Sequence, residues 1–217
     1  MRGMGVWLAR RGISVEAPLL AGHGRTWRSL ERTTWEDWYA GVEAAYERLR
    51  ARCGRVFAAG LSMGGTQVIH LAEHHPELAG LVTMAPALFL RDLRAPFLPV
   101  LRLLKRTMDF SGNGVARPGF ADLHYRRLPL GSVAELAAFQ RHVREDVSLV
   151  RCPALLFHGR LDSVVSSGDS RWALRRISSR TKRLVTMPRS AHVLPLDWDH
   201  ERMFRMILRF MKEASAL

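Results

Sequence analysis

Short apolar runs alternate along this chain with longer stretches in which hydrophobic side chains return every three or four residues. A short apolar run bounded by turn residues is typical of a buried strand, and the longer spacing is typical of a helix with one buried face. The runs lie at residues 56–59, 81–85, 154–158 and 183–187, and an alternating segment at 13–17 predicts a further strand. Strands that alternate with helices predict a mostly parallel sheet with helices on both faces.

Helices are expected between and around these strands. The sequence predicts them near residues 4–11, 33–53, 167–177 and 199–211, and after residue 64 as far as Pro76. The helix near 33–53 starts with a capping box, formed either by Thr33 with Glu36 or by Thr34 with Asp37. The last helix carries its apolar residues on one side and is expected to pack on the sheet.

The regular alternation fails between residues 89 and 150. Prolines at 96, 99, 118 and 129 interrupt this segment. A first helical patch is marked by Val100, Leu101, Leu104 and Met108. A second begins with a capping box from Ser132 to Glu135. An insertion of this size between sheet strands predicts a helical cap over the ends of the strands, at about 89–150, and a surface excursion without consequence is the alternative.

Candidate chemistry is concentrated where the run at 56–59 ends. Gly60, Ser62 and Gly64 form a Gly-x-Ser-x-Gly pattern between a predicted strand and a predicted helix, which is the arrangement of a nucleophile elbow. Its glycines let the two elements approach closely. The backbone N–H of Met63, at the positive end of the helix, is placed to face an oxyanion. Ser62 is therefore a predicted nucleophile; a tight turn that merely needs small residues is the alternative.

A serine nucleophile requires a base and a group that orients the base. Asp162 follows the strand at 154–158 and His192 follows the strand at 183–187, in the order of acid and then histidine that this architecture uses. Both loops are expected at the same edge of the sheet as Ser62. Asp197 and Asp199 compete for the role of the acid, but they lie at a helix entry, where carboxylates commonly cap, so Asp162 is favoured.

These motifs resemble the α/β-hydrolase superfamily, and within it the small bacterial carboxylesterases and monoacylglycerol lipases. The resemblance rests on residues 18–24, 60–65, 157–162 and 190–194. It implies Ser62 as nucleophile, Asp162 as acid and His192 as base. The family usually carries, ahead of the first helix, a buried strand and a His-Gly pair whose loop donates a second oxyanion N–H. No such pair precedes the first helix here, so an N-terminally shortened α/β-hydrolase is expected, with that strand encoded upstream of Met1.

The remaining histidines are predicted to be structural. His23 lies in a glycine-rich turn that the family carries without using it as the base. His70, His74 and His75 lie at the end of a predicted helix with neighbouring glutamates, but the His-Glu-x-x-His order is missing and no cysteine joins them. No metal site is therefore predicted.

Composition and charge narrow the function classes. The 217 residues, 47% hydrophobic and 24% charged, fit a single domain over residues 1–217. The net charge of +13 is dispersed along the chain, without basic blocks interleaved with aromatics, which argues against specific nucleic-acid binding and leaves contact with anionic lipid open. Neither a spanning segment nor a secretory signal is evident, so a cytoplasmic location is expected. Cys53 and Cys152 are expected to pack as small hydrophobes.

The sequence thus predicts a serine hydrolase that cleaves carboxylic esters of small or lipophilic substrates through an acyl-enzyme. Neither a metal nor an organic cofactor is required for this chemistry. The rival hypothesis is a non-catalytic or weakly active α/β-hydrolase relative that binds a small molecule or a partner protein. The candidate triad argues against the rival, and the missing oxyanion loop argues for it. The residues do not indicate an oligomeric state.

Overall fold

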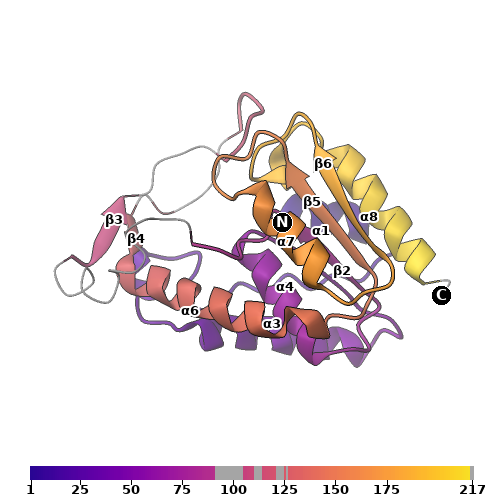
Figure 1. The fold of residues 1–217 in the computed structure, drawn as a ribbon, viewed down its shortest axis with the longest axis horizontal. Coiled ribbons are helices and arrows are strands. Elements are labelled where there is room, and N and C mark those ends of the chain that lie inside the picture. Colours follow the sequence, from indigo (N-terminus) through magenta and orange to yellow (C-terminus); the bar gives the residue numbers. More distant parts are fainter. Residues whose placement is uncertain (91–104, 110–113, 121–124, 126, 216–217) are drawn as a thin grey trace.

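A four-stranded parallel sheet forms the centre of the chain (Figure 1). The structure is a computed structural model that describes residues 1–90, 105–109, 114–120, 125 and 127–215. The sheet order is β1 (Phe57–Leu61), β2 (Gly80–Met84), β5 (Ala154–Gly159) and β6 (Lys182–Met187), and each neighbouring pair is parallel. All four predicted core strands are confirmed. Because they are parallel, their carboxyl ends lie at one edge of the sheet.

Helices cover both faces of this sheet (Figure 1). One face packs against α1 (Arg2–Ala9) and α8 (His200–Ala214), and the other against α3 (Trp35–Arg50), α4 (Met63–His74), α6 (Leu130–Asp146) and α7 (Ser167–Arg176). Strand residues alternate between the two cores: Leu156 joins the core under α3, α4, α6 and α7, whereas Leu155 and Phe157 join the core under α1 and α8. This alternation is the side-chain period of a strand.

The start of α3 follows its sequence signature. Thr34 is the N-cap; its hydroxyl accepts a hydrogen bond from Asp37 N–H, and the Asp37 carboxylate accepts one from Thr34 N–H. Of the two predicted capping boxes, the one formed by Thr34 and Asp37 is confirmed. Thr33 instead donates to Leu30 O of α2 (Trp27–Leu30) and accepts a hydrogen bond from Trp38 Nε1 at 2.8 Å.

The predicted strand at residues 13–17 is wrong. This segment has no regular secondary structure, and β1 pairs only with β2 within the described sheet. A strand needs a neighbouring backbone that supplies hydrogen bonds, and alternation in the sequence cannot provide one. The segment is held through side chains instead: Glu16 accepts hydrogen bonds from Arg48 of α3 at 3.2 Å and from Arg52 at 2.6 Å.

The segment between β2 and β5 departs from expectation in two places. Met108, assigned to a helical patch, lies in β3 (Thr107–Asp109), which pairs antiparallel with β4 (Arg127–Pro129), while Val100, Leu101 and Leu104 lie outside the described residues. The predicted capping box at Ser132 and Glu135 is also wrong, because α6 begins at Leu130 after an N-cap at Pro129. Both polar side chains bond to distant residues instead of to the start of α6: the Ser132 hydroxyl donates to Leu30 O, and the Glu135 carboxylate accepts from Trp35 N–H.

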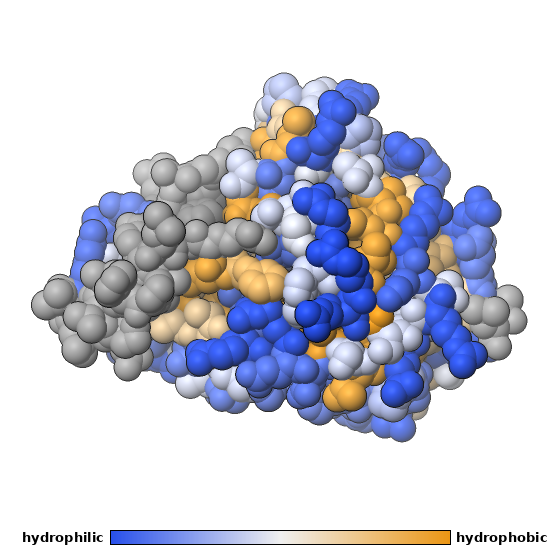
Figure 2. All heavy atoms as spheres, viewed as in Figure 1, coloured by the Kyte–Doolittle hydropathy of each residue, from blue (hydrophilic) through white to orange (hydrophobic). Residues whose placement is uncertain are grey.

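The face of the molecule shown in Figure 2 is mostly hydrophilic, and two short 3₁₀ turns lie beside the regular elements. Hydrophilic residues are spread over the face shown in Figure 2, with apolar patches between them. Two 3₁₀ turns, Val147–Leu149 and Leu194–Leu196, precede β5 and α8 respectively. None of the helices in the described part of the chain is long and apolar enough to cross a membrane.

Candidate functional site

Ser62 sits in a strained turn between β1 and α4. Its φ of 55° and ψ of −121° lie in a region that residues other than glycine rarely adopt, at a cost of about 1–3 kcal/mol. Backbone hydrogen bonds to the neighbouring strand and its loop help to hold this conformation: Ser62 N–H donates to Met84 O at 2.9 Å, and Ala87 N–H donates to Ser62 O at 3.2 Å. The hydroxyl does not cap α4, so the turn does not use it as a helix cap.

Gly60 makes this turn possible. A Cβ added at Gly60 would lie 1.9 Å from the carbonyl oxygen of Gly64, which is far inside van der Waals contact. Any side chain there would push the first turn of α4 away from the end of β1. A tight turn between strand and helix is therefore present where the sequence predicts one, and its glycine is required by the close approach of two backbones.

Met63 occupies the first position of α4. A backbone N–H in the first turn has no acceptor within its own helix, and the helix dipole gives that end a partial positive charge. These properties suit the Met63 N–H to an anionic oxygen next to Ser62. The Met63 N–H is the oxyanion donor that the sequence predicts, and it stays a prediction.

Asp162 and His192 come together at the carboxyl edge of the sheet. Asp162 lies on the loop after β5 and His192 on the loop after β6; Nδ1 of His192 is 2.9 Å from Oδ2 of Asp162. The Asp162 side chain is fully buried and that of His192 is 7% exposed. The backbone N–H groups of Val164 and Val165 donate to Oδ1 of Asp162 at 2.8 and 2.9 Å, which fixes the carboxylate.

The protonation of this pair follows from its surroundings. Burial alone raises the pKa of Asp162, but hydrogen bonds from His158, His192 and the Val165 N–H outweigh burial and bring the pKa well below its ordinary range. An ionised Asp162 only accepts hydrogen bonds, so Nδ1 of His192 carries the proton. In the neutral imidazole Nε2 then carries the lone pair, which is the state that a general base needs.

Asp197 and Asp199 have other partners. Oδ2 of Asp197 accepts hydrogen bonds from Ala191 N–H at 2.7 Å and from Ala116 N–H at 2.9 Å. Oδ2 of Asp199 accepts from the Ser190 hydroxyl at 2.8 Å and from Arg189 N–H at 2.9 Å. Both carboxylates brace the backbone of the loop that carries His192, whereas Asp162 contacts the imidazole itself.

His158 is a neighbour of the pair that sequence reasoning did not assign. It is buried at the end of β5, with Nε2 3.3 Å from Oδ2 of Asp162 and Nδ1 2.8 Å from the Ser170 hydroxyl. Its position four residues before Asp162, directly ahead of a glycine, was the available signal. Nε2 also lies 3.1 Å from Val165 O, so His158 links the end of β5 to the loop that carries Asp162.

Gly159 lets the two loops approach each other. A Cβ at Gly159 would lie 2.1 Å from Ala191 O and 2.5 Å from Ser190 O, both backbone atoms of the loop that carries His192. Leu161 N–H also donates to Ser190 O at 3.0 Å. The distance between Asp162 and His192 therefore depends on a glycine that sequence reasoning treated only as part of a motif.

Part of the segment between β2 and β5 contacts the same loop. Val193 N–H donates to Gly114 O at 2.7 Å, next to the hydrogen bond between Ala116 and Asp197.

His23 makes local contacts within its glycine-rich turn. Its Nδ1 is 3.0 Å from Ala21 O, its ring lies edge-on to Trp38, and burial lowers its pKa.

A second group of titratable residues lies at the far end of α4. Burial lowers the pKa of His70 to about 3 and raises the pKa of Glu73 to about 9. Both residues are neutral near pH 7 in this state, with Glu73 protonated and donating to Nδ1 of His70 across 2.8 Å. This pair is separate from the three candidate catalytic residues and has no part in the chemistry described above.

Comparison with known proteins agrees with this geometry. Residues 4–205 match the alpha/beta hydrolase family. The chain belongs to that family. It is 35% identical over 210 residues to the thermostable monoacylglycerol lipase of Bacillus sp. (strain H-257), covering 97% of this chain and 84% of the lipase. It is 24% identical to the carboxylesterase of Bacillus subtilis (strain 168), covering 98% of this chain and 87% of that enzyme.

Solved structures give the same fold. A structure from work on LipS and LipT, two metagenome-derived lipolytic enzymes, matches with a TM-score of 0.94 and 30% identity, covering 98% of this chain and 87% of that chain. A soluble variant of monoglyceride lipase from Saccharomyces cerevisiae matches with a TM-score of 0.75 at 17% identity, over 89% of this chain and 74% of that one, and shows the fold alone. The chain is a hydrolase of the carboxylesterase and lipase type.

Proposed function

We propose that this hydrolase cleaves carboxylic esters through an acyl-enzyme on Ser62. The observation that carries the proposal is the hydrogen bond between Asp162 and Nδ1 of His192. Both residues lie on loops that follow parallel strands, and Ser62 follows β1 of the same sheet. Asp162 orients His192, and Nε2 of His192 takes the hydroxyl proton as Ser62 Oγ attacks the ester carbonyl carbon. The Met63 N–H stabilises the resulting oxyanion.

The second half of the cycle uses the same groups. His192 passes its proton to the departing alcohol as the carbonyl–oxygen bond of the ester breaks, which leaves the acyl group on Ser62. A water molecule then gives a proton to His192 and attacks the acyl carbon. The acid leaves, and Ser62 Oγ recovers its proton from His192.

Fluorophosphonate labelling tests the nucleophile. We expect the probe to modify Ser62 alone, as mapped by mass spectrometry of peptides, because an activated serine attacks the phosphorus while other hydroxyls do not. Ser62→Ala is the matched control and is expected to take no label while remaining folded. Folded protein that takes no label would favour the rival function, a binder without catalysis, and a label on a different serine would contradict the assignment.

The substrate class that we propose is an ester with one medium or long acyl chain, such as a monoacylglycerol. Large apolar side chains are exposed on the loops of Asp162 and His192: Leu161 is 50% exposed, Val164 42% and Trp198 44%. Such residues suit contact with an acyl chain better than with a polar leaving group. The relative that is 35% identical is a monoacylglycerol lipase, which supports the same class.

A series of p-nitrophenyl esters tests the substrate class. We expect kcat/KM to rise from the acetate toward the octanoate, since each methylene that becomes buried contributes about 0.8 kcal/mol, or ~4-fold. A monoacylglycerol with the same acyl chain should be hydrolysed as well, measured by release of free fatty acid. Labelled, active enzyme with a flat or falling profile would reject the substrate class and leave the mechanism intact.

A further inference from the structure

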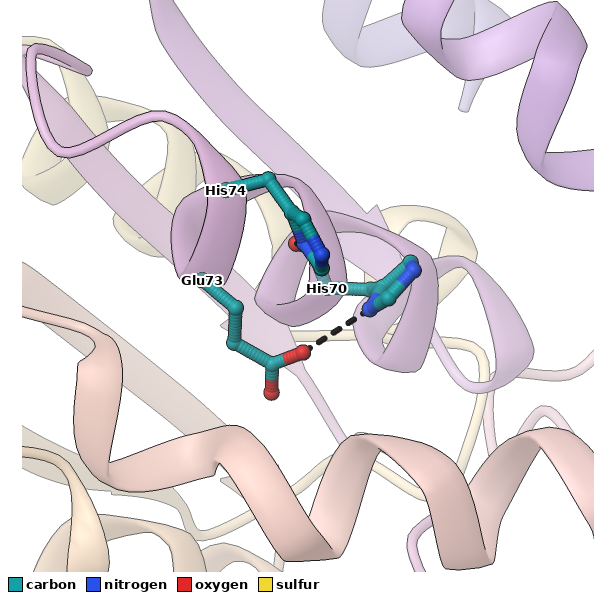
Figure 3. A group of neighbouring side chains, drawn as sticks. All are labelled: His70, Glu73 and His74. Atoms are coloured by element: carbon teal, nitrogen blue, oxygen red, sulfur yellow. Dashed lines mark hydrogen bonds and ion pairs between the residues drawn. The ribbon is translucent and has the colours of Figure 1, made fainter.

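Three side chains with metal-binding atoms gather at the last turns of α4. His70, Glu73 and His74 project from the helix, with Glu73 turned back toward His70 (Figure 3). One ligand atom from each residue lies within 4.8 Å of the other two. The spacing explains this, because residues three and four positions apart lie on one side of a helix. The order His-x-x-Glu-His is the reverse of His-Glu-x-x-His, and both orders place two histidines four residues apart on one helix face, the spacing at which such pairs bind zinc.

Burial leaves one oxygen of Glu73 without a partner. Glu73 is 7% exposed and His70 is 4% exposed. Oε2 of Glu73 lies 2.8 Å from Nδ1 of His70, while Oε1 is buried without a hydrogen-bond partner in the described part of the chain. A buried carboxyl oxygen that lacks a partner is unfavourable, and a bound cation would satisfy it. Oε2 is the oxygen that faces the His70 imidazole (Figure 3), so a cation in the cluster would meet Oε2 first and would reach Oε1 by binding both oxygens of the carboxylate.

His74 provides access from solvent. It is exposed, and its Nδ1 lies 3.0 Å from His70 O, so Nδ1 donates to that carbonyl and Nε2 keeps its lone pair. A hydrogen bond from the non-ligating nitrogen is the usual support for a histidine that binds a metal, since it fixes the ring and the tautomer. An ion can thus enter from the His74 side and meet the buried pair behind it.

Rings from two other helices surround the cluster. The ring centroid of Tyr39 in α3 lies 4.5 Å from that of His70, and the rings of Phe139 and His142 in α6 lie at 5.4 and 5.1 Å. These contacts hold the His70 imidazole in place before any ion binds. They also mean that an ion on α4 would stabilise the layer in which α3, α4 and α6 meet.

We propose that His70, Glu73 and His74 form a zinc-binding site. Two imidazoles and a carboxylate are a preferred donor set for Zn²⁺, and water would fill the fourth position on the exposed side. The site is structural: it lies at the opposite end of α4 from Ser62, a helix about 18 Å long for its 12 residues.

A neighbouring group offers a matched control. Glu43, Glu47 and His75 also bring their ligand atoms within 4.8 Å of one another. Both nitrogens of His75 already have carboxylate partners, however: Nε2 lies 2.7 Å from Glu43 and Nδ1 lies 3.3 Å from Glu77. That group is more exposed, and Glu77, which is outside the group, also contacts the imidazole, so zinc is assigned to the His70 cluster.

Zinc titration of the full chain tests the proposal. The protein, without an affinity tag, is stripped with a chelator, checked by elemental analysis and titrated with Zn²⁺ in a calorimeter. We expect one ion per chain and a rise in Tm when zinc is added. Co²⁺ in the same site should give the absorption bands of a tetrahedral ion.

Three variants separate this site from other sources of binding. Glu73→Gln and His74→Ala should each weaken zinc binding by at least about 10-fold. Loss of a residue that only supports a metal ligand already lowers metal affinity by about 10- to 100-fold, and loss of a ligand should cost no less. His75→Ala should bind zinc as the parent does. A folded chain that takes up no zinc overturns the proposal, and so does unchanged affinity in both Glu73→Gln and His74→Ala. Loss of zinc binding in His75→Ala would move the ion to the other group and also overturn it.

Discussion

Ser62→Ala and His192→Ala are each expected to lower kcat for ester hydrolysis by about 10⁴- to 10⁶-fold, as loss of one member of such a triad does. The two residues act as a unit, because Ser62 is a weak nucleophile without a base and His192 has no proton to accept without Ser62. The double variant should therefore lose little more than either single variant.

Steady-state hydrolysis of a p-nitrophenyl ester measures all three variants against the parent. Thermal unfolding of each should stay close to the parent, since Ser62 does not cap α4 and Asp162 keeps its hydrogen bonds from Val164 and Val165. Losses that add up in the double variant would mean that the two residues act in different steps. The mechanism through a single acyl-enzyme would then be wrong.

Asp162→Asn is expected to lower kcat by about 10⁴-fold. An asparagine can turn its NH₂ toward Nδ1 of His192, which then has to accept a hydrogen bond instead of donating one. The ring proton moves to Nε2, and His192 can no longer take the proton of Ser62. Because the pKa of Asp162 lies well below its ordinary range, the carboxylate of the parent is ionised throughout the pH range of an ester assay, so the comparison is between a carboxylate and an amide at every pH used.

Asp197→Asn and Asp199→Asn are the matched controls. Both carboxylates accept hydrogen bonds from the loop around His192, at Ala191 N–H and at the Ser190 hydroxyl, and an asparagine carbonyl oxygen still accepts one. We expect these variants to keep most of their kcat and to unfold at a lower temperature. A loss of kcat in Asp197→Asn as large as that in Asp162→Asn would contradict the choice of acid.

The sequence by itself determined the positions of the core strands along the chain and the identity of the candidate residues. The strands at 56–59, 81–85, 154–158 and 183–187 were predicted because each is a short apolar run closed by turn residues, a property of local sequence. Ser62, Asp162 and His192 could be named because each follows one of these runs. Parallel strands place the loops that follow them at one edge, so topology alone predicts that the three residues meet.

Local polar signals were less reliable. The box at Thr34 and Asp37 forms, whereas the equally good signature at Ser132 and Glu135 does not, because Leu30 O and Trp35 N–H offer these side chains tertiary partners. The alternating segment at 13–17 forms no strand, because a strand depends on a neighbouring backbone that no local pattern reveals.

Only the tertiary structure decided among the alternatives that share a local pattern. The sequence favoured Asp162 over Asp197 and Asp199 only from their positions in the loops, whereas the distance of 2.9 Å to Nδ1 of His192 is a direct contact that the other two do not make in the described part of the chain. The same holds for Glu73, whose buried Oε1 has no hydrogen-bond partner in the described part of the chain, a fact that depends on α3 and α6 packing around α4. Spacing along the chain sets which residue types can meet, and packing between distant segments sets their burial and their partners.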